Sequence, residues 1–324
     1  MQLDTNIILQ AVPAFILLII VEAVYLIREH RFPNTKKDML ASAGLSLGYF
    51  ILGPITKASN LIVYALLYQY RICALPNNMW LAWILCFLAY DFTHYWSHRL
   101  SHEVRFLWAS HSVHHSAEVF TLSTAFRLSW TSNLSGLFLF WAWMPLVGVT
   151  PAMLLFMKAL TGIYAFWLHT EAIKKLPKWI EAVFNTPSHH RVHHASDVEY
   201  LDKNHGGALI VWDKIFGTFC EEGHAPKYGL TTNVPSQNPF VITFFEWNNL
   251  FRDLKKARNL REGLNYIFRA PGWSKDGSTK TTRQLQAAGA KEIKSTVHSN
   301  CENCSSATCK FAGKSGGFVK GFAE

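Results

Sequence analysis

The sequence predicts an all-α integral membrane protein, with four to five transmembrane helices topped by a helical cytosolic cap that carries a polyhistidine metal site. Two observations predict this class. Four long apolar stretches lie between residues 6 and 168, and ten of the fifteen histidines fall in three short clusters within or close behind apolar stretches. Histidine is the commonest metal ligand, and its neutral imidazole suits iron, zinc, copper and nickel.

The first two apolar stretches predict membrane helices near the N-terminus. Residues 6–27 are long enough to span a bilayer and contain one charged residue, Glu22. They lack a basic n-region and an obvious small-residue cleavage site, which favours an anchor over a removed signal peptide. Residues 41–68 are interrupted at Gly53-Pro54, which leaves either one kinked span or two short segments.

The next two stretches lead into the histidine clusters. Residues 79–97 predict a third span that runs directly into the first cluster. Residues 134–168 are too long for one crossing and break at 148–151, so we expect a hairpin of two helices. Lys158 is a charge inside the second arm of this hairpin, where it either snorkels or faces a cavity.

The distribution of basic residues predicts the orientation. Arg28, Arg31, Lys36 and Lys37 follow the first span, whereas only Arg71 follows the second. The positive-inside rule therefore places residues 28–40 in the cytosol. With one crossing by residues 41–68, all three histidine clusters also face the cytosol. The formal net charge of +9 then fits anionic lipid headgroups, and since nothing resembles a nucleic-acid module we expect no nucleic-acid partner.

Composition divides the chain into three regions. We expect an N-terminal transmembrane region at 1–75, a catalytic domain at 76–273, and a polar tail at 274–324 that is disordered. Within the tail, Cys301, Cys304 and Cys309 have the spacing of a small zinc knuckle, which is the alternative to disorder. Residues 239–273 predict either an interfacial amphipathic segment on anionic lipid or an ordinary surface helix packed on the cap.

The spacing of the clustered histidines is helical. Residues three and four apart share one face of a helix, so each cluster can present two or three imidazoles in one direction. The clusters are His94, His98 and His102, then His111, His114 and His115, and finally His189, His190, His193 and His194. A lone interfacial histidine is more often a hydrogen-bonded or snorkelling side chain than a ligand. Repetition in three places favours metal ligation, and facing helices of this kind can surround two metal ions. His94, His189 and His205 are surplus to the pattern.

Other catalytic motifs fail on spacing or context. His102-Glu103 has no second histidine at the position that a zincin requires. No glycine-rich nucleotide-binding loop is present. Residues 44–48 match the GxSxG pattern of a nucleophile elbow, but they lie in an apolar helical stretch. Their small side chains therefore indicate helix–helix packing.

The motifs HRLSH (98–102), HSVHH (111–115) and HRVHH (190–194) resemble the eight-histidine signature of the fatty acid hydroxylase superfamily, which includes sterol desaturases. Residues 95–129 and 184–222 resemble its alkylglycerol monooxygenase-like and bacterial sterol-desaturase-like branch nearly throughout. The likeness covers residues 80–273 and includes the order and the spacing of the motifs.

This resemblance implies a non-haem di-iron centre. The implied ligands are His98, His102, His111, His114, His115, His190, His193 and His194. Members of the family often use further histidines, and His169 fits a position between the motifs while His189 fits one beside them. Glu103 matches an acidic residue of the ether-lipid branch and either orients a ligand histidine or is a solvated carboxylate. Where members commonly have Asn-Tyr-Gly, this chain has Asn204-His205-Gly206, so His205 adds a ligand or a proton relay, or leaves that position without its usual role.

The resemblance implies an O2-dependent oxidoreductase that hydroxylates or desaturates a C–H bond of a sterol, fatty acyl or ether lipid. The electron donor is then external, a reduced pterin, a cytochrome or a ferredoxin, because the chain has no haem or flavin motif of its own. The alternative is a histidine-rich membrane protein that binds or transports metal without redox catalysis. Transporters normally place their ligands near the bilayer midplane, whereas these clusters lie at span ends, which favours the enzyme.

Overall fold

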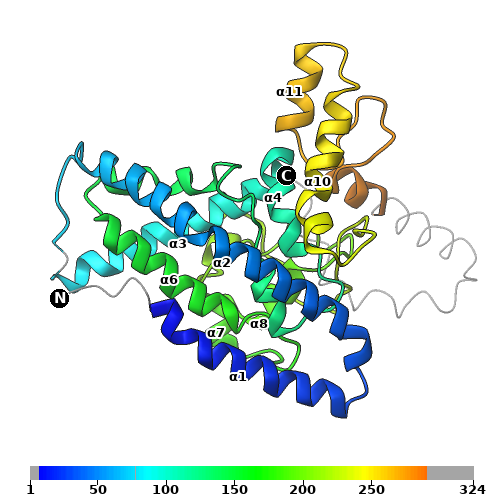
Figure 1. Ribbon diagram of the computed structural model, residues 1–324, viewed down its shortest axis with the longest axis horizontal. Coiled ribbons are helices and arrows are strands. Elements are labelled where there is room, and N and C mark those ends of the chain that lie inside the picture. Colours follow the sequence, from blue (N-terminus) through cyan, green and yellow to red (C-terminus); the bar gives the residue numbers. More distant parts are fainter. Residues whose placement is uncertain (1–6, 77, 290–324) are drawn as a thin grey trace, which may run out of the picture.

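The computed structural model describes residues 7–76 and 78–289, and the regular structure in these ranges is helical (Figure 1). Among the described residues, extended pairing is limited to two isolated bridges. The all-α prediction is therefore confirmed. The helices are α1 (Ile7–Arg28), α2 (Phe32–Tyr68), α3 (Trp80–Glu103), α4 (Arg105–His115), η1 (Leu122–Phe126), η2 (Leu137–Trp141), α5 (Trp143–Leu146), α6 (Pro151–Phe166), α7 (Lys178–Val183), α8 (Pro187–His193), α9 (Val211–Ile215), α10 (Pro239–Leu254) and α11 (Leu260–Phe268).

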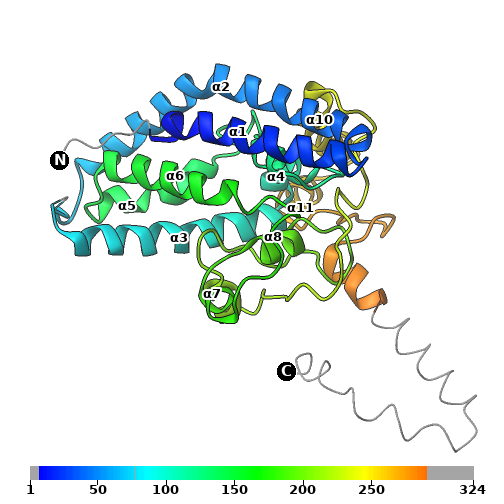
Figure 2. The same cartoon turned by 90° about the horizontal axis from the view of Figure 1, so that it is seen from below.

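Helices α1, α2, α3 and α6 lie side by side and form the body of the molecule (Figure 2). Two of them, over Gln10–Arg28 and Thr35–Tyr68, are long and apolar enough to cross a membrane. Their outward side chains include Leu17, 61% exposed, and Ile55, 71% exposed, and outward apolar faces of this kind suit lipid contact. No other described helix meets the same criterion, so the predicted four to five spans stay a prediction.

The second apolar stretch is one helix. Helix α2 continues through Pro54 and begins at Phe32, earlier than the predicted start at residue 41. Apolar helices tolerate an internal proline when neighbouring groups satisfy the freed carbonyl. The alternative of two short segments is therefore wrong.

The 134–168 region breaks where the sequence predicts, but its first arm is short. Gly148 adopts φ 98°, and the Thr150 hydroxyl accepts a hydrogen bond from the Met153 amide at 3.2 Å, which caps α6. Before this break, helical structure is confined to Leu137–Leu146. Because an α-helix rises 1.5 Å per residue, such an arm is shorter than the roughly 30 Å hydrocarbon core. The expected hairpin is thus one short arm followed by one 16-residue helix.

The GxSxG match at 44–48 has the predicted packing role. The Trp130 ring lies so close to Gly48 that a side chain there would collide with it. The indole nitrogen of Trp130 donates to the Leu45 carbonyl at 2.8 Å, and the Ser46 hydroxyl donates to the Phe126 carbonyl at 2.7 Å. Because the Ser46 hydroxyl is held by a backbone carbonyl inside a helix contact, it is not placed as a nucleophile.

The segments that follow α6, which we call the cap, cover one end of the helical body. All seven residues of α8 are buried, and Arg191 fixes this helix through two 2.7 Å bonds to the Glu222 carboxylate. Asp91 of α3 accepts hydrogen bonds from the amides of Ala208 and Leu209 and so joins the cap to the body. The first contact holds α8 to the segment around Glu222, and the second holds the segment that follows α8 to the middle of α3.

Helix α10 packs on α4, as the surface-helix alternative for residues 239–273 predicts, and the interfacial alternative stays a prediction. Trp247 and Leu250 pack against Ala109 of α4, whereas Phe240 is 66% exposed. Residues 274–289 of the predicted disordered tail are described, and residues 282–289 are helical. Cys301, Cys304 and Cys309 lie outside the described residues.

Candidate metal centre

Nine buried or half-buried histidines converge in two groups at the end of the helical body. Cluster 1 consists of His98, His102, His111, His115 and His193, and cluster 2 consists of His114, His169, His190 and His194. Within each cluster, one ring nitrogen of every residue lies within 4.8 Å of the corresponding nitrogens of the others. The structure thus brings together all eight histidines of the three motifs, together with His169.

The separations between ring nitrogens match those expected around a metal ion. In cluster 2, the Nε2 atom of His190 lies 2.9 Å from that of His169 and 3.2 Å from that of His194. In cluster 1, the Nε2 atoms of His111 and His115 are 3.1 Å apart. Imidazole nitrogens bound to one metal at about 2.0–2.1 Å, with tetrahedral or octahedral angles, stand about 3 Å from each other. The donor sets therefore fit metal ions.

Hydrogen bonds at Nδ1 direct the Nε2 lone pairs inward. His169 Nδ1 donates to the Ala165 carbonyl at 2.9 Å, and His193 Nδ1 donates to the Lys203 carbonyl at 2.9 Å. Because a carbonyl only accepts, Nδ1 carries the proton and Nε2 carries the lone pair. Among the described residues, the Nε2 atoms of His102 and His193 are buried without a hydrogen-bond partner. A cation is the group that such converging lone pairs fit.

Burial keeps these imidazoles neutral. Desolvation, reinforced by neighbouring histidines, lowers the pKa of His115 and of His194 well below the ordinary value. Desolvation likewise lowers the pKa of His114 to about 4. At neutral pH the rings therefore present lone pairs, which is the form that binds metal.

The i, i+3, i+4 triplets divide between the two clusters. His111 and His115 of α4 enter cluster 1, whereas His114 enters cluster 2. In α8 the assignment is reversed, since His190 and His194 enter cluster 2 and His193 enters cluster 1. Of the two or three imidazoles expected to point in one direction, two do so in each triplet, namely the i and i+4 members. Successive residues of a helix diverge by about 100°, so the i+3 ring reaches the neighbouring cluster.

The two clusters are in direct contact through stacked histidine rings. The rings of His115 and His194 stack with their centroids 4.4 Å apart and their planes at 23°. His190 and His193 stack similarly, with centroids 5.4 Å apart. Two ions held by these clusters would be neighbours, as a dinuclear centre requires.

Glu103 is not placed to orient a ligand. Its carboxylate accepts from Arg99 Nε at 3.0 Å, and its side chain is 34% exposed. His102 instead donates Nδ1 to the Asp202 carboxylate at 3.3 Å. The direction of Glu103 has a simple cause: it is the residue after His102 on the same helix and points about 100° away. The carboxylate with the expected orienting geometry is Asp202.

The surplus histidines lie outside both clusters. The Nδ1 atom of His189 lies 3.3 Å from the Thr186 hydroxyl, and its ring packs on Phe219, so we do not retain it as a ligand. His94 contacts the ring of His98. His205 is fully buried with its ring centroid 5.0 Å from that of His102, and its Nδ1 has no hydrogen-bond partner among the described residues.

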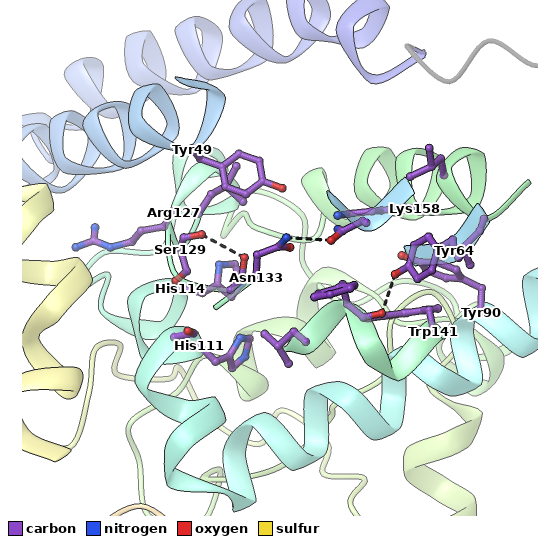
Figure 3. Close-up of a pocket in the computed structure, with 18 residues that line it drawn as sticks. Tyr49, Tyr64, Tyr90, His111, His114, Arg127, Ser129, Asn133, Trp141 and Lys158 are labelled. Carbon is purple, nitrogen blue, oxygen red and sulfur yellow. Dashed lines mark hydrogen bonds between the residues drawn. The ribbon is translucent and has the colours of Figure 1, made fainter. Parts of the chain in front are cut away.

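A cavity of about 270 Å³ reaches both clusters (Figure 3). His111 of cluster 1 and His114 of cluster 2 lie at one side of it, and Lys158, Tyr64, Tyr90 and Trp141 lie at the other. Of the two alternatives for Lys158, the structure places it on a cavity wall. Phe138 and Trp141 also line the cavity, whereas Phe140, Trp143, Phe166 and Trp167 are not among its lining residues.

Comparison with known proteins identifies the class. Residues 83–218 match the family model of fatty acid hydroxylases. This range contains every histidine of both clusters. The chain therefore carries a domain of the fatty acid hydroxylase family, as the motifs predict.

Among the relatives are two alkylglycerol monooxygenases. The one from Danio rerio is 35% identical over 269 residues, which are 82% of this chain and 59% of that protein. The one from Homo sapiens is 34% identical over 266 residues, again 82% of this chain and 59% of the relative. The ornithine lipid hydroxylase OlsE of Rhizobium tropici is 28% identical over 144 residues, 44% of this chain and 42% of that protein. No solved structure shows significant similarity. The chain thus spans somewhat over half the length of its alkylglycerol monooxygenase relatives.

Sequence reasoning missed the groups that hold the ligands in place. These are the Asp202 carboxylate and the carbonyl oxygens of Ala165, Lys203 and His205. Asp202 follows the third histidine motif closely, and this proximity was the available signal. The backbone carbonyl groups carry no signal in the sequence, because every residue has a carbonyl group.

Proposed function

We propose that this chain is a membrane-bound monooxygenase that uses two iron ions, O2 and an external electron donor to hydroxylate a C–H bond of a lipid. The observation that carries the proposal is the pair of adjacent histidine clusters beside a shared cavity. The names of the relatives, alkylglycerol monooxygenase and ornithine lipid hydroxylase, support oxidation of a lipid.

Cluster 1 would hold one iron and cluster 2 the other. Neutral imidazoles suit several divalent metals, and membership of the fatty acid hydroxylase family favours iron among them. When bound, two irons supply the electrons and the oxidising power that side chains lack for attack on an unactivated C–H bond. The reaction converts the lipid, O2, two electrons and two protons into the hydroxylated lipid and water, so a reductant from outside the chain completes it.

The cavity supports a substrate whose oxidised carbon lies close to a polar head. Its polar lining includes Ser129, Ser132, Asn60 and Asn133, and Asn133 donates to the Asn60 side chain at 2.9 Å. The buried indole nitrogen of Trp141, which also lines the cavity, has no hydrogen-bond partner among the described residues. An oxygen atom of a lipid head would satisfy this indole donor, while the alkyl chain of the lipid extends among the apolar helices.

The outward apolar faces of α1 and α2 support placement in a membrane. The positive-inside rule, applied to the basic residues after the first span, favours the cytosolic face for the histidine clusters. Arg31, in the basic turn between these helices, pairs with Glu171 at 2.7 Å. Glu171 lies two residues after the cluster 2 histidine His169. The basic turn and the clusters therefore lie on the same side of the proposed membrane.

The proposal is tested by metal analysis and turnover on the full chain in lipid nanodiscs. We expect about two tightly held irons per chain, and a mass increase of one oxygen atom when an ether or acyl lipid is incubated with O2 and a reductant. The His114→Ala variant, with the exposed His224→Ala variant as its control, should lose turnover. Loosely exchanging zinc without iron, or full turnover by His114→Ala, would contradict the proposal and favour the metal-handling alternative.

A further inference from the structure

Three of the five cluster 1 histidines are oriented by one short loop, residues Asp202–His205. Each of the three donates its Nδ1 proton to an oxygen of this loop. The bonds are His98 Nδ1 to the His205 carbonyl at 2.8 Å, His102 Nδ1 to the Asp202 carboxylate at 3.3 Å, and His193 Nδ1 to the Lys203 carbonyl at 2.9 Å. The loop therefore contacts two ligands from α3 and one ligand from α8.

These bonds determine where the lone pairs point. An imidazole whose Nδ1–H is bound to a fixed oxygen carries its lone pair on Nε2 and keeps one ring orientation. The remaining two ligands, His111 and His115, do not need the loop, because they share one face of α4. Cluster 1 thus joins one helical pair to three ligands whose directions are set by the loop.

The loop has an uncommon backbone conformation that several hydrogen bonds hold in place. Asp202 and Asn204 both have φ 56°, in the left-handed region that side chains other than glycine rarely occupy. The Asn204 amide compensates, since its nitrogen donates to the Cys220 carbonyl at 2.7 Å and its oxygen accepts from the Cys220 amide at 2.8 Å. Asp213 adds bonds from the amides of His205 and Gly206. A strained backbone that is bonded at so many points indicates a functional constraint.

A segment far along the chain braces the same loop from outside. Gln286 donates to the carbonyls of Val198 and Leu201 at 3.2 and 3.1 Å, directly before the loop. The Thr282 side chain hydrogen-bonds the Asp202 carboxylate. The first part of the polar tail is thus connected to the group that orients His102.

Cluster 2 has no such dependence. His169 donates Nδ1 to the Ala165 carbonyl at 2.9 Å, at the end of α6 and only four residues earlier. Neither this bond nor the Nε2 contacts of His190 and His194 involve the loop. Among the described residues, no side chain of a cluster 2 histidine is bonded to this loop, whereas three side chains of cluster 1 are.

We propose that the loop Asp202–His205 is the positioning element of cluster 1, and that it makes metal binding at cluster 1 separable from metal binding at cluster 2. The proposal rests on the proposed metal centre. Asp202 acts through His102 and is a positioning residue. Loss of an orienting partner beside a metal ligand typically lowers metal affinity by about 10–100-fold. Loosening the loop should therefore lower the affinity of one site and leave the other unchanged.

The test is a Co²⁺ titration of the metal-free full chain in nanodiscs, followed by visible absorption and by metal content after dialysis against a chelator. Asp202→Gly removes the carboxylate while glycine accepts the left-handed φ without strain. Glu199→Gly is the matched control, because it removes a 62% exposed carboxylate from the same segment that no cluster histidine contacts. Asp202→Asn retains an acceptor oxygen and provides a second variant with less risk of misfolding.

We expect two tight sites in the native chain and in Glu199→Gly. In Asp202→Gly we expect one tight site and one weakened by about 10–100-fold, with a smaller loss in Asp202→Asn. Equal weakening of both sites, or two unchanged tight sites in both Asp202 variants, would overturn the inference. If the native chain itself holds no metal, the proposed function fails instead, so the two failures are distinguishable.

Discussion

Cluster 1 and cluster 2 draw on the same two helices in opposite proportions. Helix α4 gives two ligands to cluster 1 and one to cluster 2, and helix α8 gives one to cluster 1 and two to cluster 2. What completes them differs. Cluster 1 takes two ligands from α3, whereas cluster 2 takes His169 from the segment after α6. The comparison teaches that an H-x2-H-H motif on a helix contributes to two clusters, because its i and i+4 members enter one cluster and its i+3 member enters the other.

The largest effects should come from removing one ligand at a time, which tests the assignment of the histidines to two clusters. His194→Ala should empty cluster 2 and His115→Ala should empty cluster 1, each leaving about one metal per chain. Each variant should lose turnover by more than about 100-fold, since loss of a ligand exceeds the effect of losing its partner. Metal content and lipid turnover are the measurements. Retention of two metals by either variant would contradict the assignment of the clusters.

Acid should affect both clusters together. Burial lowers the pKa of His193 in cluster 1 well below its ordinary value and that of His114 in cluster 2 to about 4, so these rings are neutral in the folded chain. In the unfolded chain these rings take up protons near pH 6.5. The unfolded state therefore binds more protons between about pH 6.5 and 4, so stability falls as the pH falls through this window.

Thermal unfolding of the metal-free chain measures this effect. We expect its melting temperature to be level above about pH 7 and to decrease steadily towards pH 5. The free energy of unfolding should fall by up to about 1.4 kcal/mol per histidine for each pH unit. Metal-loaded protein should release its metal over the same range, because protonated imidazole does not bind metal. A melting temperature that rises on acidification would contradict the buried, neutral histidines.

The cavity side chains should affect substrate binding without affecting either metal. Asn133→Ala removes an amide that lines the cavity, and Lys158→Met removes its cation while keeping the length of the side chain. We expect KM to rise by roughly fivefold for each, as for the loss of one hydrogen bond of about 1 kcal/mol. Metal content should stay at the native value. Loss of metal from either variant would show that the cavity wall supports the clusters instead.

The smallest effect is expected at Glu103. Glu103→Gln breaks a partly exposed pair with Arg99, and such pairs contribute about 0–1 kcal/mol. We expect less than about a twofold change in turnover and two retained metals. Compared with Asp202→Gly, this variant tests whether Asp202 is the orienting carboxylate, since a large metal loss at Glu103 would restore the sequence-based assignment.

Much of the site was predictable because helical periodicity is local. The spacing of His98 with His102 and of His111 with His115 determines which rings share a face, and the order of the motifs indicates the family. Two features were not predictable on this basis. The split of each triplet depends on how α4 and α8 lie relative to each other, and the absence of His189 from cluster 2 depends on which way one buried ring points.

By itself, the sequence determined the helical class, two helices long and apolar enough to cross a membrane, the nine histidines that converge and the family of the domain, because periodicity, composition and motif order are carried by neighbouring residues. The tertiary structure alone decided the pairing of these histidines into two clusters and their orientation by Asp202 and by backbone carbonyls. The physical reason is that these contacts join segments up to 107 residues apart through groups that leave little or no pattern in the sequence.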